Sequence, residues 1–92
     1  MLQWDALKDP DEIKDYSLDW SEVLEGGDTL IDSEWTVTSG DNLTIVSQPY
    51  TSTHSIVWLS GGEIGTYHLL NRVETFGGRI YDQTVKLKVK SK

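Results

Sequence analysis

The sequence contains no cysteine, which excludes the disulfide frameworks and thiolate metal sites that stabilise many small domains. Long apolar runs are also missing. No stretch reaches the roughly 18 apolar residues of a membrane-spanning helix, and the N-terminus lacks the basic-then-apolar order of a signal peptide. We therefore expect a single soluble domain over residues 1–92, made without export and without membrane contact.

Basic side chains are scarce: 8 lysines and arginines stand against 15 acidic residues, for a net charge of -7. The imbalance is concentrated in residues 1–41, which carry twelve acidic and two basic residues, whereas residues 42–92 carry three and six. An acidic surface repels phosphate, so nucleic-acid binding is disfavoured. Two interpretations of this asymmetry are open. The two halves form ordinary solvated faces, or their opposite charges orient the chain head to tail or toward a partner.

Recognisable catalytic and cofactor motifs are absent. His54 and His68 stand alone without a zinc-binding pattern, no GxSxG elbow occurs, and the Gly-Gly pairs at 61–62 and 77–78 lack the Lys-Ser or Lys-Thr of a phosphate loop. The sequence therefore predicts a protein that is not an enzyme and has no cofactor.

The acidic residues near the N-terminus raise the hypothesis of a calcium site. Asp9, Asp11, Glu12 and Asp15 supply hard oxygen ligands within seven residues, but the EF-hand spacing is missing. Turn formation and capping explain these acids without an ion. We expect no metal.

Hydrophobic periodicity indicates an all-β protein. From Thr84 to Lys90 the chain alternates strictly, with three aliphatic residues on one face and three lysines on the other. Lysine at every outward position is also a common protection of a sheet edge. Similar runs, separated by glycine-rich breaks, occupy residues 2–6, 14–20, 29–38, 43–47, 55–60 and 65–75. Their number predicts a β-sandwich of about seven antiparallel strands.

The segment from Asp9 to Leu24 has two interpretations. Asp9, Pro10 and Glu12 resemble a helix start, and a helical stripe can be drawn through the residues that follow. A period of two fits as well, with the β-formers Tyr16 and Trp20 on one face. We predict a tight turn at 9–12, a strand at 14–20 and a connection at 22–28.

One tyrosine sharpens the fold class to immunoglobulin-like. Tyr67 opens the penultimate strand, where such folds place a tyrosine whose hydroxyl bonds backbone a few residues upstream. Leu69 stands where antibody domains have their second cysteine, so the core is expected to be free of disulfides. The predicted core consists of Tyr16, Leu18, Trp20, Ile31, Trp35, Val37, Ile45, Val57, Leu59, Tyr67, Leu69, Val73, Val85, Leu87 and Val89.

The run from Ile56 to Leu59 is apolar on both faces of its strand. A sandwich buries only one of them, so either Val57 with Leu59 or Ile56 with Trp58 faces outward. The outward pair is covered by the N-terminal segment, with Trp4 as neighbour, or it docks another protein. Stacking of sugar rings on Trp58 is a third interpretation that needs flanking polar groups.

Several motifs, in order, resemble one protein family. They are Lys8-Asp9-Pro10-Asp11-Glu12, Asp15-Tyr16 leading to Leu18-Asp19-Trp20, Glu34-Trp35-Thr36-Val37, Val57-Trp58-Leu59-Ser60-Gly61-Gly62, Gly65-Thr66-Tyr67, Asn71-Arg72-Val73 and Gly77-Gly78-Arg79. This succession, over residues 8 to 90, resembles small structural proteins of tailed phages and prophages, often labelled fibre-to-tail adaptor or head-tail region proteins. The acidic connection at 22–28 and the Leu69-Leu70 pair depart from the threonine-rich versions of the family.

The resemblance implies an immunoglobulin-like β domain that works by assembly in a virion and performs no chemistry. Its partners would be other virion proteins of the tail, fibre or head-tail connector, met in the cytoplasm of the bacterial host; association with further copies of the chain stays open. We predict Trp58, Ile56, Arg72 and Arg79 as partner contacts. The alternative is a carbohydrate-binding or adhesive surface domain on the same sandwich.

Overall fold

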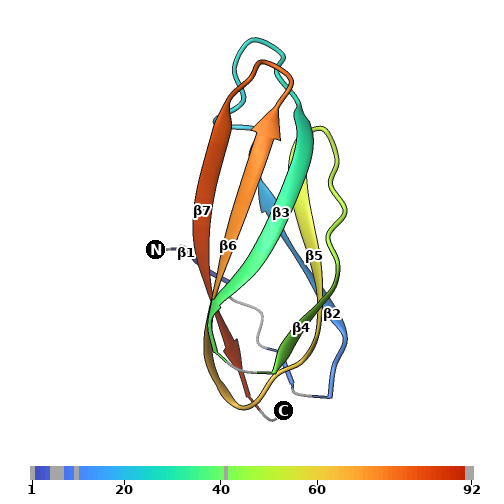
Figure 1. The fold of residues 1–92 in the computed structure, drawn as a ribbon, viewed down its shortest axis with the longest axis vertical. Helices are drawn as coiled ribbons and strands as arrows, with labels where there is room; N and C mark the ends of the chain where they lie inside the picture. The colour runs from blue at the N-terminus through green and yellow to red at the C-terminus, as the bar shows by residue number, and fades with distance from the viewer. Residues whose placement is uncertain (1, 5–7, 10, 41, 91–92) are drawn as a thin grey trace.

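Two β-sheets stack face to face in the molecule (Figure 1). The computed structural model describes residues 2–4, 8–9, 11–40 and 42–90. Within them the strands are β1 (Leu2–Gln3), β2 (Lys14–Asp19), β3 (Leu30–Ser39), β4 (Leu43–Ser47), β5 (His54–Gly61), β6 (Gly65–Thr75) and β7 (Ile80–Val89). Strands β1-β7-β6-β3 form the large sheet, and β2-β5-β4 form the small sheet. The predicted all-β architecture is confirmed.

The N-terminal strand corrects the prediction of about seven antiparallel strands, because β1 runs parallel to β7. The pairing continues past β1: the N–H groups of Trp4 and Lys8 donate to the carbonyls of Lys86 and Lys88 at 3.1 and 3.2 Å. The N-terminal segment therefore covers the edge of β7. Of the strand predicted at 2–6, residues 5 and 6 lie outside the described residues.

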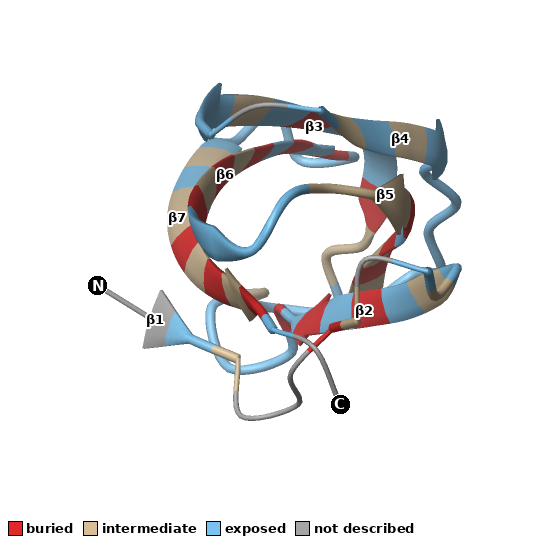
Figure 2. Ribbon diagram, turned by 90° about the horizontal axis from the view of Figure 1, so that it is seen from below, coloured by how far each residue is buried: buried red, intermediate tan, exposed pale blue. Residues whose placement is uncertain are grey.

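Alternation along the strands builds the core between the sheets (Figure 2). Side chains on the inner faces of β5, β6 and β7 are almost completely buried, while those on the outer faces are partly or fully exposed. The buried core consists of Tyr16, Leu18, Trp20, Leu30, Trp35, Val57, Leu59, Tyr67, Leu69, Val73, Val85, Leu87 and Val89. The core contains no disulfide, because the chain has no cysteine.

One residue of the predicted core is wrong. Ile31 is 44% exposed, and Leu30, which we did not predict, is buried instead. The cause is a register shift in the pairing of β3 with β6 between Leu30 and Asp32. A bulge inserts an unpaired residue and so reverses the alternation at that point. Val37 and Ile45 are only partly buried at the border of the core.

The ambiguous acidic segment forms a turn followed by a strand. The N–H of Glu12 donates to the carbonyl of Asp9 at 3.0 Å, and the N–H of Asp11 donates to the Asp9 carboxylate at 2.9 Å. Pro10 lies outside the described residues. Because β2 begins two residues after this turn, the strand interpretation is confirmed, and residues 22–28 form the predicted connection.

Tyr67 forms the corner predicted from the sequence. Its hydroxyl accepts a hydrogen bond from the N–H of Glu63 at 2.6 Å and donates one to the carbonyl of the same residue at 2.9 Å. The ring lies against Gly40, where a Cβ atom would overlap it. This corner fixes the β5–β6 connection against the end of β3.

A buried polar network joins the two sheets. The Ser55 hydroxyl on β5 donates to the Asn71 side-chain oxygen on β6 at 2.5 Å, and the Trp20 indole N–H donates to the same hydroxyl at 2.9 Å. The Asn71 amide donates to the Ser33 hydroxyl and to the Glu34 carbonyl on β3, at 3.1 and 3.0 Å. Asn71 therefore connects both sheets, two residues along β6 from Leu69, the position of the second cysteine in antibody domains.

The side chain of Lys8 is completely buried near the C-terminal end of β5. Its ammonium donates to the carbonyls of Asp9 at 3.0 Å and Gly61 at 2.6 Å. Burial lowers the pKa of Lys8, although the charges of Glu12, Asp9 and Asp11 act in the opposite direction. These bonds fasten the N-terminal segment to the end of β5.

Burial makes Tyr16 a source of alkaline instability. Desolvation, with smaller contributions from the charges of Glu12 and Asp15, raises the pKa of Tyr16 to about 12. The folded state thus favours the neutral phenol more than the unfolded state does. The contribution of Tyr16 to the unfolding free energy is complete below the unfolded pKa of about 10, and it is lost as the pH rises toward 12. We expect on the order of 2 kcal/mol of unfolding free energy to disappear across this range.

Denaturant unfolding at a series of pH values measures this loss, with Tyr16→Phe as the control. The variant should show a shallower decline between about pH 10 and 12, whatever its absolute stability. An ultraviolet titration in which all four tyrosines ionise together near pH 10 while the fold remains intact would contradict the assignment.

Candidate protein-binding surfaces

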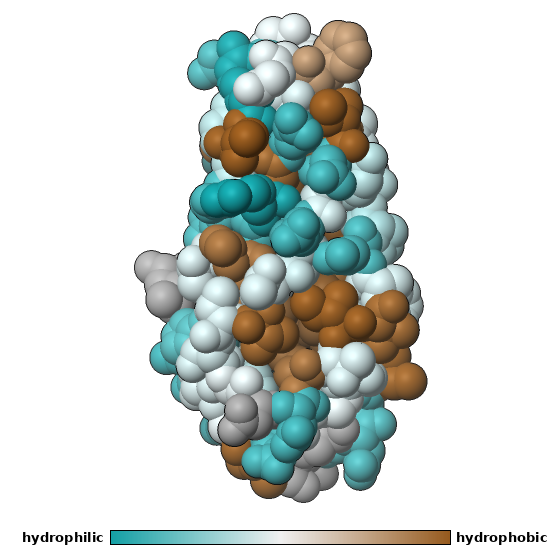
Figure 3. All heavy atoms as spheres, viewed as in Figure 1, coloured by the Kyte–Doolittle hydropathy of each residue, from teal (hydrophilic) through white to brown (hydrophobic). Residues whose placement is uncertain are grey.

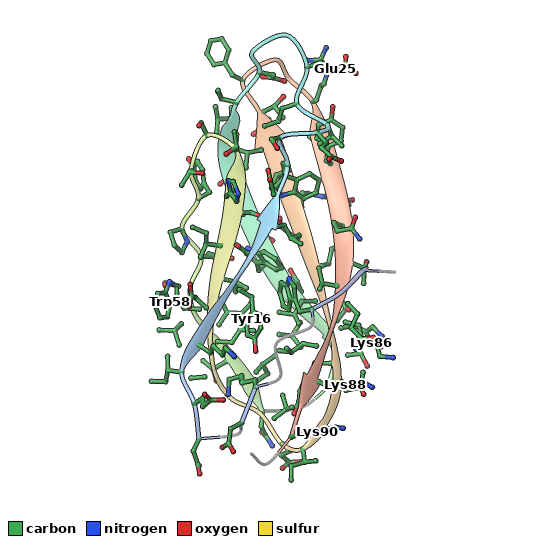
Figure 4. All side chains as sticks on the ribbon, turned by 180° about the vertical axis from the view of Figure 1, so that it is seen from behind. Tyr16, Glu25, Trp58, Lys86, Lys88 and Lys90 are labelled. Atoms are coloured by element: carbon green, nitrogen blue, oxygen red, sulfur yellow. The ribbon has the colours of Figure 1, made fainter. Side chains whose placement is uncertain are left out.

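The outer face of the small sheet carries the first two predicted contact residues. Val57 and Leu59 point into the core and are fully buried, so Ile56 and Trp58 face outward. This settles the question that the apolar run on β5 left open. Ile56 is half-buried, and Trp58 is 39% exposed, projecting from the side of the molecule (Figure 4).

Further apolar side chains lie on the same side of the molecule. Val46 is exposed on β4 at a register shift in its pairing with β5. Ile13, 67% exposed, precedes β2 by one residue and shares the parity of its outward positions. We name Ile13, Val46, Ile56 and Trp58 the small-sheet patch. Hydrophobic side chains gather in Figure 3 over the half of the molecule that contains β4.

Polar groups border this patch. Trp58 stands opposite Asp15 on β2 and Ser47 on β4, both exposed. At the far end of β2, a carboxylate oxygen of Asp19 lies 3.8 Å from Nε2 of His54. A hydrogen bond from the Ser21 N–H is the main cause that lowers the pKa of Asp19, with the charge of His54 as a smaller one. The patch is therefore apolar with an acidic side along β2.

Cover of Trp58 with Trp4 as its neighbour, one of the two interpretations of the outward pair, is wrong for the described part of the N-terminal segment. Trp4 packs against the core instead, stacked on Tyr16 with ring centroids 4.6 Å apart and tilted against Trp35 at 5.6 Å. Its backbone follows β7, whereas Trp58 lies on the outside of the small sheet. Trp58 is thus left exposed.

The two predicted arginines lie elsewhere. Arg72 is on the outer face of the large sheet, where it binds both carboxylate oxygens of Asp82 on β7 at 2.8 and 3.0 Å. This contact lowers the pKa of Asp82 and raises that of Arg72. The structure therefore brings Trp58 and Ile56 together on one face and separates them from both arginines.

Arg79 lies at the end of the sandwich formed by the β2–β3 and β6–β7 connections. Its guanidinium lies 3.1 Å from Asp28, and the same carboxylate accepts the N–H groups of Gly77 at 2.8 Å and Thr29 at 3.0 Å. A hydrogen bond from the Thr75 hydroxyl is the largest of the causes that lower the pKa of Asp28. Arg79 and Asp28 thus hold the two connections together.

This end of the molecule also exposes a large aromatic side chain that the sequence analysis did not single out. Phe76 is 80% exposed and lines, with Glu25, Gly27 and Arg79, an open hollow of about 650 Å³. Its position in a Gly-Gly turn was the available signal, since a core residue would stand within a strand. The exposure of Ile13 had no comparable signal.

Metal-binding clusters and membrane-spanning helices are both absent from the described residues. Nowhere in residues 2–4, 8–9, 11–40 and 42–90 do three His, Cys, Asp or Glu side chains gather as they would to hold a metal ion. Of the described part of the chain, no helix has the length and apolarity needed to cross a membrane.

Comparison with solved structures places the fold. The chain resembles the PKD domain of the KIAA 1837 protein, solved in solution, with a TM-score of 0.60 and 22% identity over 100% of this chain and 89% of that domain. No curated protein matches the chain. The two-sheet topology, the tyrosine corner and this likeness define an all-β domain of the immunoglobulin-like class, as predicted.

A family model then places the chain in a family. The model described as podophage GP4 fiber-tail adaptor protein gp77 matches residues 8–88, and the chain belongs to this Gp77 family. The resemblance noted in the sequence motifs is thereby confirmed. Membership gives the chain a structural role in phage tail assembly, as a virion component that interacts with other tail or fibre proteins.

Proposed function

We propose that the chain performs no chemistry and acts as a protein-protein interaction module, assembled in the host cytoplasm, whose small-sheet patch binds another virion protein. The observation that carries this proposal is the exposed Trp58 beside Ile56, on a face that no segment in the described part of the chain covers. Tryptophan is prominent among the residues that dominate binding energy at interfaces.

The surroundings of Trp58 support an interface with a defined orientation. The apolar residues Ile13 and Val46 extend the contact area on both sides, and Asp15 gives one border a negative charge. A partner that offers an apolar pocket with basic residues along one rim fits this arrangement, because a polar rim fixes the register of an apolar centre. Arg72 and Arg79 are proposed as secondary contacts, since their side chains remain 62% and 49% exposed beside their ion pairs.

Replacement of Trp58 by alanine tests the proposal. Trp58→Ala should lower the unfolding free energy by about 1 to 2 kcal/mol and leave the chain folded, because the indole lies outside the core but is only 39% exposed. Truncation of a tryptophan anchor removes about 2 to 4 kcal/mol of binding energy, so incorporation of the chain into particles should fall at least roughly tenfold. Quantitative immunoblots of purified particles from hosts that produce the variant measure this fraction.

Leu70→Ala is the matched control. Leu70 is a half-buried apolar residue on the outer face of the large sheet, so it tests whether any outward apolar side chain has the same effect. Normal incorporation of Trp58→Ala, with the variant shown to be folded, would exclude the patch as the contact.

A second function is favoured by the polar groups beside the indole. Asp15 and Ser47 stand directly across from Trp58, as required of residues that would hydrogen-bond a sugar stacked on the ring. A carbohydrate-binding or adhesive role predicts that particular glycans, selected by glycan-array screening, reproducibly quench the tryptophan fluorescence. The absence of such quenching, together with defective particle incorporation, favours assembly.

A further inference from the structure

The two ends of the sandwich differ in the side chains that they expose, and the acidic residues Asp9, Asp11 and Glu12 lie near the end that carries Lys90. The long axis of the molecule extends 43 Å, against 23 and 19 Å across. In Figure 4, Glu25 lies at one end, while Lys88 and Lys90 lie near the other. In the same view Trp58 lies on the opposite side of the molecule from Lys88 and far from Glu25, so the two end surfaces are separate from the small-sheet patch.

At the first end an aromatic side chain projects among acidic residues. Phe76 is 80% exposed, and Ile80, paired with Glu74, is exposed at the start of β7. Glu25 and Glu74 are exposed at the same end, and neither takes part in an ion pair within the described residues. We name Glu25, Glu74, Phe76 and Ile80 the acidic tip. The one arginine of these connections, Arg79, is neutralised by Asp28.

At the opposite end a small hollow is bordered by lysines. Ile64, 67% exposed, lines it together with Thr66 of β6, Lys88 of β7 and Lys90, which follows β7, and its volume is about 230 Å³. Neither lysine forms an ion pair in the described part of the chain. We name Ile64, Lys88 and Lys90 the lysine groove. It offers an apolar floor with positive charge at its rim.

From these two surfaces we infer that the chain associates head to tail with a second copy of itself, the acidic tip of one molecule seated in the lysine groove of the next. The phenyl ring of Phe76 meets Ile64, and the carboxylates of Glu25 and Glu74 face Lys88 and Lys90. An exposed aromatic provides burial at such a contact, and opposite charges set its direction. Because the two surfaces differ, the contact is heterologous and can be repeated from molecule to molecule.

Sedimentation velocity over a range of protein concentrations tests this contact. The wild-type chain should associate at about 0.05 M NaCl, and its association constant should fall at least tenfold at about 0.5 M, because exposed charge pairs are screened. A wild-type protein that remains monomeric at low salt and high concentration overturns the inference.

Charge reversal identifies the surfaces. The tip variant Glu25→Lys/Glu74→Lys and the groove variant Lys88→Glu/Lys90→Glu should each be monomeric, since each brings like charges together. Mixed in equal amounts they should associate again, because both junctions between unlike variants are then complementary. Association of either variant alone, or no association of the mixture, contradicts the assignment, provided circular dichroism shows both to be folded.

Trp58→Ala separates this contact from the partner site. That variant should self-associate like the wild type while losing its place in particles. The tip variant should lose self-association in the sedimentation assay while keeping its place in particles. The failure of one proposal therefore leaves the other intact.

Discussion

Asn71→Ala should lower the unfolding free energy by about 3 kcal/mol, measured by denaturant unfolding. The substitution leaves the Ser55 hydroxyl, the Ser33 hydroxyl and the Glu34 carbonyl without the partner that each has inside the sandwich. Each buried polar group that loses its hydrogen bond costs about 1 to 3 kcal/mol. Against a typical total of about 5 to 15 kcal/mol for a small domain, this loss is large.

Two comparisons show whether the network is responsible. Arg72→Ala changes the next residue on the outward face of β6 and removes only an exposed ion pair, so its effect should be far smaller. In a double-mutant cycle, Ser55→Ala and Asn71→Ala should couple by about 1 kcal/mol or more. Strict additivity of the two losses would show that the bond between the sheets contributes nothing of its own.

Gly40→Ala should destabilise the chain by at least about 3 kcal/mol, because two penalties coincide. The backbone of Gly40 has a φ of 112°, which residues with a side chain rarely adopt. A Cβ atom at this position also overlaps the ring of Tyr67, which the corner hydrogen bonds hold in place. The ring can escape only by breaking its bonds to Glu63.

Gly26→Ala is the control for the backbone penalty alone. Its φ of 61° is also positive, but a Cβ atom there meets nothing within 4 Å. It should lose about 1 kcal/mol, and the difference between the two thermal or denaturant transitions gives an upper bound on the cost of displacing Tyr67, because a φ of 112° is itself less accessible than one of 61°. Equal losses for the two variants would show that the tyrosine ring moves aside freely.

Local patterns in the sequence were sufficient to predict most of the strands. The alternation in β6 and in the C-terminal half of β7, and the position of Tyr67 after the glycine at 65, depend on neighbours along the chain and survive folding unchanged. The start of β7 was predicted four residues late, because Ile80 and Tyr81 follow the Gly-Gly turn without a clear alternation.

The remaining features depend on contacts between distant residues. The bulge that exposes Ile31 arises from the pairing of β3 with β6, and the partners of Arg72 and Arg79 are ten or more positions away along the chain. Asn71 did leave a trace in the sequence, as a polar residue on the face that Tyr67 and Leu69 share. Only the folded sheets show which groups it binds.

The parallel course of β1 beside β7 has a mechanical consequence. Tension applied between the N-terminal end of β1 and the C-terminal end of β7 pulls two parallel neighbours in opposite directions along their length. The backbone bonds at Trp4 and Lys8 are then strained simultaneously, and the Lys8 ammonium adds its hold on Gly61. Rupture requires several bonds to fail together. A chain loaded through these two ends therefore resists extension far better than a hairpin whose hydrogen bonds break one after another.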